Sequence, residues 1–327
     1  MTLARSLELD AQGHTPFGAL SYGARADVPW MSSVSARLLA PADTMVDVWH
    51  ADGHVESGTT GMVRWRTDGH WILGAVDLQE TAGDGGLVEL ARRTYENLFE
   101  ALRQAGCPHL LRLWNYLPQI NADGGGLERY RQFNLGRHQA FVDAGQATFE
   151  GAPAACALGL LEGQLCLRFL AGRAPALPIE NPRQVSAYRY PASYGPQPPT
   201  FSRAALAALG GGEIGLFISG TASIVGHESV HRDDVQAQLR ETVANLRAVV
   251  DAANTRSSAR FDLAQTDCVV YVRHADQLPL IQHELALALG ADAPALRHAV
   301  YVEADICRSE LLVEIEGMAT APGELPA

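Results

Sequence analysis

The chain has 327 residues, of which 47% are hydrophobic and 19% charged, a balance typical of a globular protein with a full core. Its formal net charge of −12 argues against nucleic acids and anionic membranes as partners, because both bind basic surfaces. Five scattered cysteines form no Cys-x-x-Cys pair, which indicates free thiols and no zinc site.

Neither targeting nor cofactor binding is indicated by the sequence. The N-terminus lacks the apolar core of a signal peptide, and no run approaches the roughly 18 apolar residues of a membrane span. His50 and His54 have metal-like spacing but no third ligand, so we expect structural roles for them. We therefore expect a cytoplasmic protein with no metal and no cofactor.

A repeat organises the chain after an N-terminal elaboration, which we assign to residues 1–60. The first copy predicts an alternating strand, an amphipathic helix that ends at Gly106, a second strand, a second helix and a closing strand pair. These elements fall at 71–77, 87–102, 110–115, 127–141, 154–160 and 164–171. They form a module that we assign to residues 61–172.

A proline-rich segment follows, which we assign as a connector over residues 173–212. Seven of the 17 prolines lie between positions 175 and 199. Such a composition is typical of a stiff linker. Three tyrosines, Tyr188, Tyr190 and Tyr194, are unusual in a plain linker, so a packed segment that faces a site is an equal alternative.

The second copy has the same parts in the same order. They are expected at 214–220, 235–250, 268–273, 278–289, 299–305 and 311–319. We assign this module to residues 213–320 and a tail to residues 321–327. The glycine or asparagine at the end of the first helix of each copy, Gly106 or Asn254, suits a left-handed C-cap.

Three parts of the second copy resemble the RidA/YjgF superfamily. They are Phe217-Ile-Ser-Gly220, the pair Gln238 and Asn245, and Leu312-Val-Glu-Ile-Glu-Gly-Met-Ala319. The resemblance implies an α+β fold with two RidA/YjgF-like modules, each a mixed sheet backed by two helices. In the first copy Leu167 stands where the second has Glu314, so the first module is interpreted as degenerate.

From about residue 60 to residue 320 the chain resembles the two-module chorismatases. The resembling segments are 111–121, 126–137, 182–188, 219–223, 226–228 and 304–308. Chorismatases split chorismate into pyruvate and either a dihydroxycyclohexadiene carboxylate or a hydroxybenzoate. Chorismate is therefore the expected small-molecule substrate.

Glu314 is the candidate catalytic acid. Cleavage of the enolpyruvyl ether begins with protonation of the enol methylene, which requires a carboxylic acid whose pKa is raised by burial. In Val313-Glu-Ile-Glu316, strand alternation places Glu314 and Glu316 on one face. A solvated acidic face is the usual interpretation of such a pair, and the resemblance reverses it for Glu314. Glu316 is either structural or helps to keep Glu314 protonated.

Gly220 and Cys307 are the candidates that select the ring product. The resemblance implies that chorismatases forming 3-hydroxybenzoate have glycine and cysteine at these positions. Those that hydrolyse chorismate have alanine and a bulkier aliphatic residue. Glycine opens space beside the substrate, and a thiol can act as a weak donor near the rearranging ring. A small buried hydrophobe is the alternative role for Cys307.

Cations are needed for the two carboxylates of the substrate. Arg131 and Arg137 match the family motif, and arginine bonds both oxygens of a carboxylate. The complete set of expected substrate-binding residues is Arg131, Arg137, Tyr188, Gly220, Thr221 and Arg273.

The leading interpretation is a chorismate lyase that forms 3-hydroxybenzoate. In length and segments the chain also resembles the two-product members of the xanthomonadin pathway, which implies 4-hydroxybenzoate as a further product. The alternatives are a chorismate hydrolase, a RidA-like imine hydrolase and a metabolite-binding protein. The sequence leaves a monomer and a RidA-like trimer open.

Overall fold

The computed structural model describes residues 2–6, 15–22, 31–34, 36–41, 45–51, 53–81 and 85–326. The first module is a sheet with two helices on one face. Its elements are β6 (Glu56–Thr60), β7 (Val63–Thr67), β8 (Trp71–Leu78), α1 (Gly86–Ala105), β9 (His109–Pro118), α2 (Arg129–Asp143), β10 (Ala154–Leu160) and β11 (Leu165–Gly172). A strand from late in the chain, β19 (Asp305–Ile306), completes the sheet in the order β19-β10-β9-β11-β8-β7-β6.

The second module is built in the same way, and β4 (Arg37–Ala40) from the N-terminal part completes its sheet. The other elements are β12 (Leu177–Ile179), β13 (Ala204–Gly210), β14 (Glu213–Ala222), α3 (Val235–Thr255), β17 (Asp267–Val272), α4 (Leu278–Leu289), α5 (Pro294–Arg297), β18 (Val300–Glu303) and β20 (Val313–Pro322). The strand order is β12-β13-β14-β20-β17-β18-β4.

The topology of the two sheets confirms the predicted repeat. Strands β10-β9-β11-β8 of the first sheet occupy the places of β18-β17-β20-β14 in the second. In each sheet one strand pair is parallel, β9 with β10 and β17 with β18, while the other neighbours are antiparallel. The expected α+β class with two modules is therefore present, each sheet backed by its two long helices.

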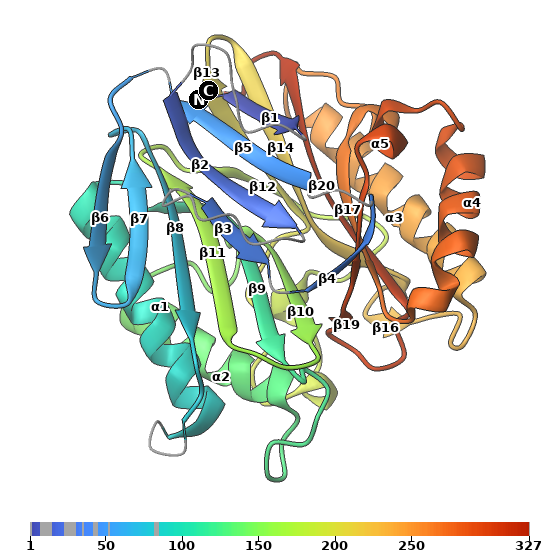
Figure 1. The fold of residues 1–327 in the computed structure, drawn as a ribbon, viewed down its shortest axis with the longest axis horizontal. Coiled ribbons are helices and arrows are strands. Elements are labelled where there is room, and N and C mark those ends of the chain that lie inside the picture. The colour runs from blue at the N-terminus through green and yellow to red at the C-terminus, as the bar shows by residue number, and fades with distance from the viewer. Residues whose placement is uncertain are drawn as a thin grey trace.

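A third sheet comes from the N-terminal part of the chain. It has the order β1-β5-β2-β3, with β1 (Thr2–Ser6), β2 (Thr15–Tyr22), β3 (Met31–Val34) and β5 (Met45–Ala51). Figure 1 shows these strands over the two module sheets, with α1 and α2 at one side of the molecule and α3 to α5 at the other. The remaining elements are β15 (Ile224–Val225), β16 (Glu228–Ser229) and the 3₁₀ turns η1 (Ala187–Arg189), η2 (Ala192–Tyr194), η3 (Leu263–Gln265) and η4 (Ala275–Gln277).

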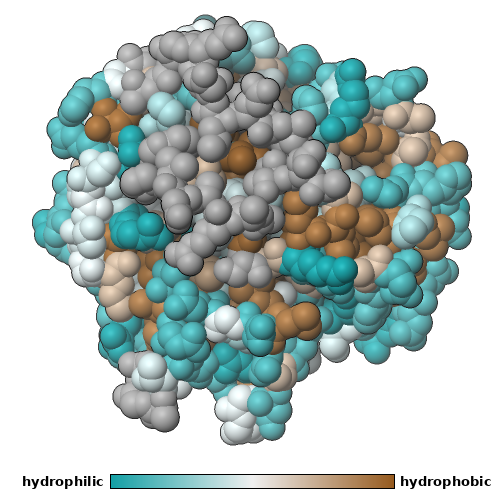
Figure 2. Space-filling view, in the orientation of Figure 1, coloured by the Kyte–Doolittle hydropathy of each residue, from teal (hydrophilic) through white to brown (hydrophobic). Residues whose placement is uncertain are grey.

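The largest apolar cluster lies where the three sheets meet. Trp49 of the N-terminal sheet, Trp114 of β9 and Phe217 of β14 all belong to it and are almost fully buried. Separate clusters fill the space between each module sheet and its helices. In Figure 2, polar side chains cover much of the rim over the helices, and apolar ones are more common toward the middle. Each module sheet therefore has two buried faces, and the face opposite the helices meets the other sheets.

Two local predictions need correction. Gly106 ends α1 with a φ of 65°, as a left-handed C-cap requires, but α3 continues past Asn254 to Thr255. The Asn254 side chain instead bonds the backbone of Phe261. The counterpart of Glu314 in the first module is also Cys166 rather than Leu167. Cys166 pairs with Tyr116 as Glu314 pairs with Tyr271, whereas Leu167 lies in the core on the helix side.

Candidate active site

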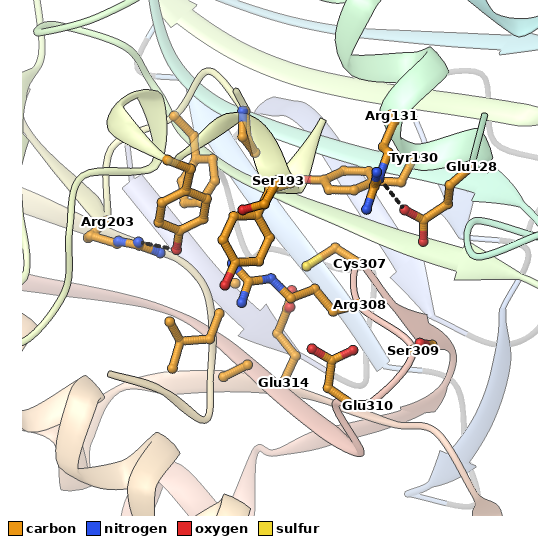
Figure 3. Close-up of a pocket in the computed structure, with 17 residues that line it drawn as sticks. Glu128, Tyr130, Arg131, Ser193, Arg203, Cys307, Arg308, Ser309, Glu310 and Glu314 are labelled. Carbon is orange, nitrogen blue, oxygen red and sulfur yellow. Dashed lines mark hydrogen bonds and ion pairs between the residues drawn. The ribbon is translucent and has the colours of Figure 1, made fainter. Parts of the chain in front are cut away.

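A cavity of ≈ 350 Å³ opens at the junction of the two modules. Helix α2 of the first module, the segment between β12 and β13, and three parts of the second module all contribute to its wall. Figure 3 shows Glu314 and Glu310 directed into the cavity, with Tyr130 and Arg131 facing them from α2. Since neither module encloses this space alone, the site depends on both modules.

Glu314, on β20, lines the cavity and is buried. Alternation along the strand directs it away from the helices, while Val313 and Ile315 enter the helix-side core. The residue is only 4% exposed. No described side chain or backbone group hydrogen-bonds to its carboxyl oxygens. The carboxyl is therefore buried, lines the cavity and is available to a bound molecule.

The surroundings of Glu314 favour its protonated form. Burial raises the pKa of this carboxyl to about 8, and the negative charge of Glu316 adds to the rise, while Arg112, Arg203 and Arg273 oppose it. At neutral pH most Glu314 side chains therefore carry a proton. A buried carboxylic acid of this kind can donate its proton to a molecule in the cavity.

Glu316, two residues further along the same strand face, is bound by the first module. Arg112 Nη2 lies 2.5 Å from Glu316 Oε2, and Trp114 Nε1 donates a hydrogen bond of 3.1 Å to Oε1. All three residues are at most 3% exposed. Glu316 is thus a carboxylate held by partners on β9 rather than a second free acid.

The segment that carries Cys307 crosses from one sheet to the other. Strand β19 pairs with β10 of the first module, and the chain then returns through residues 307–312 to β20. Arg273 fixes this return, because it forms an ion pair with Asp305 and donates to the backbone carbonyls of Ile306, Arg308 and Leu311. Cys307 consequently faces the cavity, and burial raises the pKa of its thiol to about 12. It remains a neutral thiol near pH 7.

Two arginines in the cavity wall are oriented by tyrosines. The Arg308 guanidinium carbon lies 4.1 Å from the ring centre of Tyr194 and 5.2 Å from that of Tyr190. Arg203 Nη2 donates to the hydroxyl of Tyr190 at 2.7 Å. Buried Nη2 of Arg308 and Nε of Arg203 have no hydrogen-bond partner among the described residues. Both guanidinium groups therefore retain donors for an anion.

A third arginine comes from helix α2. Arg131 lines the cavity, and its Nε lies 3.1 Å from Glu128 Oε2 (Figure 3). Its side chain is 37% exposed, so it lies nearer the opening than the largely buried Arg203. The cavity thus offers cationic groups near its opening and along its wall, together with the buried acid Glu314.

The structure brings four of the expected site residues to the cavity. They are Glu314, Cys307, Arg131 and Gly220. The remaining four do not line it: Arg137 is buried against Phe133 and bonds Asn134, Tyr188 packs on Phe149, Thr221 bonds the backbone of Ser219, and Arg273 fixes the β19 segment.

Sequence reasoning missed several residues of the wall. The chief ones are Tyr190, Tyr194, Phe201, Arg203, Arg308 and Glu310. The tyrosine-rich connector is the signal for the first two, but the expected substrate-binding tyrosine, Tyr188, does not line the cavity. Arg308 directly follows Cys307 in a segment already noted for its resemblance. Nothing in the sequence around Arg203 distinguishes it from a surface arginine.

Within the described residues, no three His, Cys, Asp or Glu side chains gather as ligands for a metal ion. No helix in these ranges combines the length and the apolar character that a membrane crossing demands.

Comparison with known proteins gives concordant results. Residues 47–171 match the family model described as Chorismatase FkbO/Hyg5-like, N-terminal. A 3-hydroxybenzoate synthase of Streptomyces hygroscopicus is 35% identical over 94% of this chain and 92% of its own length. A chorismatase of Streptomyces rapamycinicus is 37% identical over 84% of this chain and 82% of its own. A crystal structure of a chorismatase superposes with a TM-score of 0.84 at 32% identity, covering 97% of this chain and 98% of the other.

Proposed function

The chain belongs to the chorismatase family, and from that premise we propose that it converts chorismate to pyruvate and a hydroxybenzoate with Glu314 as general acid. The observation that carries the proposal is the state of Glu314. It is a buried carboxyl with a pKa raised to about 8 by burial, and it lines a cavity that also holds arginines. Chorismate fits that arrangement, because its two carboxylates can bind the arginines and its enol ether can take a proton from the acid.

The proposed first step is proton transfer from Glu314 to the enol methylene of the substrate. The methylene becomes a methyl group, and the ether-bearing carbon becomes an oxocarbenium centre. That carbon is then attacked by water or by the C4 hydroxyl of the substrate. In the second case the hydroxyl proton returns to the Glu314 carboxylate as a cyclic ketal forms. One ring carbon–oxygen bond and the opposite ketal carbon–oxygen bond then break to release pyruvate. The ring proton lost on aromatisation is balanced by the proton that the remaining oxygen takes up as a phenol, so no water is consumed. General acid catalysis of this type contributes about 10²–10⁴-fold to a rate.

We assign the two substrate carboxylates to the arginines of the wall. Arg203 and Arg308 are oriented by tyrosine rings and have donors free, and Arg131 lies near the opening of the cavity. Charge-assisted bonds from guanidinium groups are roughly twice as strong as neutral hydrogen bonds. The cavity volume of ≈ 350 Å³ is within the range of small-molecule sites, about 300–1,000 Å³.

For the ring product we propose 3-hydroxybenzoate, with 4-hydroxybenzoate to be measured beside it. Gly220 and Cys307 both line the cavity with Glu314, and the neutral Cys307 thiol is a donor rather than a nucleophile. The name of one relative, 3-hydroxybenzoate synthase, supports the same product. No specific observation favours the diene diol, imine hydrolysis or binding without turnover.

The experiment is incubation of the purified protein with chorismate, followed by quantification of pyruvate and separation of the ring products. We expect equal amounts of pyruvate and hydroxybenzoate. Pyruvate accompanied by the diene diol would refute the product assignment alone. The absence of both products, with chorismate unchanged, would refute the proposed function.

A further inference from the structure

Glu314, the acid of the second module, lies beside Glu316, whose carboxylate is bound by side chains of the first module. Glu316 shares its strand face with Glu314, and Arg112 and Trp114, which bind its carboxylate, are on β9. Trp114 also stacks against the arginine, whose guanidinium carbon is 5.1 Å from the indole ring centre. The indole thus contacts both charged groups of the pair, which limits the positions that either can take.

The Arg112–Glu316 pair is not explained by stability alone. Its side chains are 1% and 4% exposed, and buried pairs of this kind can often be replaced by apolar residues at little or no cost. Nε and Nη1 of Arg112 have no hydrogen-bond partner among the described residues, so part of the guanidinium is left unsatisfied. A charge kept at such a cost, next to the acid that lines the cavity, points to a role in the chemistry.

We propose that Glu316 is a positioning residue, which as a carboxylate keeps its neighbour Glu314 protonated, and that Arg112 and Trp114 of the first module act through it. This inference rests on the proposed function of Glu314 as general acid. It also gives the first module a part in the reaction, although that module has Cys166 where the second has Glu314.

The charges around Glu314 are consistent with this role. The groups that face it are Glu316, Arg112 on β9, Cys156 on β10, Arg203 before β13, Arg273 after β17, Tyr130 on α2 and Cys307 after β19, and Arg308 and Glu310 line the same cavity. Burial raises the pKa values of both thiols and of the tyrosine, so these three are neutral near pH 8. Among the charged groups with the largest effects on Glu314, Glu316 favours the protonated acid, and the three arginines oppose it.

The test uses variants that change the charge in opposite directions. Glu316→Gln leaves the Arg112 cation without its counter-charge and should move the alkaline limb of the kcat–pH profile down by about one unit or more. Arg112→Gln leaves two adjacent buried carboxyls that share one proton, and should move the limb up. A purely structural role would lower activity in both variants without opposite displacements. Displacement in the same direction, or none, would overturn the proposal.

A second measurement does not depend on turnover. Infrared titration of the substrate-free protein follows the band of the protonated carboxyl that Glu314→Gln removes. Its midpoint should fall in Glu316→Gln and rise in Arg112→Gln. If Glu314→Gln retains full turnover while these midpoints still move, the general-acid role fails and the charge coupling stands. If Glu314→Gln is inactive and the midpoints stay fixed, the coupling fails alone.

Two further variants guard against misfolding and against a general effect of charge. Arg112→Gln combined with Glu316→Gln leaves no unpaired buried charge, and its midpoint should fall, because the charge removed from Glu316 outweighs that removed from Arg112. If Glu316→Gln does not fold, this double variant decides the question. Glu310→Gln removes a charge from the same cavity, where the carboxylate is 25% exposed and better screened by water, and should lower the midpoint less than Glu316→Gln does. An equal fall in Glu310→Gln would contradict the proposal.

Discussion

Glu314 lies so close to Gly220 that a β-carbon built on the glycine would be 2.0 Å from Glu314 Oε1. Cβ atoms are not tolerated at that distance, so any side chain at position 220 must displace the carboxyl. From the sequence, the glycine was expected to open space beside the substrate. In the structure the glycine leaves room for the Glu314 carboxyl itself, because the two residues are on neighbouring strands, β14 and β20.

The first prediction concerns the ring product. Gly220→Ala displaces the Glu314 carboxyl, and Cys307→Val removes the thiol from the cavity. We expect the double variant to form more diene diol and less hydroxybenzoate while pyruvate release continues. A change of 1.4 kcal/mol in relative barriers alters the product ratio about tenfold. Chromatography of the ring products measures the ratio, and an unaltered ratio at normal turnover would show that these positions do not control it.

The second prediction concerns the carboxylate-binding arginines. Arg308→Lys keeps the charge but loses the planar group that stacks on Tyr194 and the free Nη2 donor. Loss of a charge-assisted contact costs roughly 1.5–3 kcal/mol, so kcat/KM for chorismate should fall by about 10- to 100-fold. Arg189→Lys is the matched control, since that arginine is 66% exposed and lies outside the cavity. Similar kinetics in the two variants would place the substrate carboxylates elsewhere.

The third prediction concerns the contact between the modules. The hydroxyls of Tyr116 and Tyr271 lie 2.9 Å apart, and both residues are buried. Tyr116→Phe leaves the Tyr271 hydroxyl without this partner, which should lower the free energy of unfolding by about 1–3 kcal/mol. The double change to phenylalanine should cost less than the sum of the two single changes. Urea unfolding of the four proteins measures this coupling, and strict additivity would show that the hydroxyls do not interact.

The fourth prediction follows from the raised pKa of Glu314. Burial raises this pKa from an ordinary value of 4.5 to about 8, so the native state binds the proton more tightly than the unfolded state does. The stability that this proton contributes is complete below pH 4.5 and is lost as the pH rises toward 8. Glu314→Gln lacks this dependence and should gain stability relative to the parent protein between pH 5 and pH 9. Urea unfolding at both pH values tests this, and a constant difference would contradict the shift.

Much of the fold was predictable because its elements follow simple periodicities. The repeat was visible in the order of strands and helices, and alternation placed Glu314 and Glu316 on one face of their strand. The structure shows that this face is buried and turned away from the helices. The choice of Leu167 as the counterpart of Glu314 was wrong by one position, since Glu314 lies 69 residues after Asn245 and the residue 69 positions after Asn97 is Cys166. The strand pairing agrees with Cys166. The two copies share the order of their strands and helices, but that order alone does not show which single residues correspond.

The site was less predictable because contacts between modules decide it. Tyr188, Tyr190 and Tyr194 are alike in the sequence, but the turns η1 and η2 bring only the latter two to the cavity. Arg273 was expected to bind the substrate, but its guanidinium group donates hydrogen bonds to the backbone of the segment that follows from β19. No local pattern indicates that Glu316 would find its partners 204 and 202 positions away in the chain.

The most direct test of the central claim is the turnover of Glu314→Gln with chorismate. Glutamine keeps the shape of the side chain but has no proton to donate, so kcat for pyruvate release should fall by about 10²–10⁴-fold. Chorismate should still bind, because the arginines of the wall are unchanged, and calorimetric titration of the variant would show it. A variant that binds chorismate and retains more than about a tenth of the parent kcat would contradict the assignment of Glu314 as the acid.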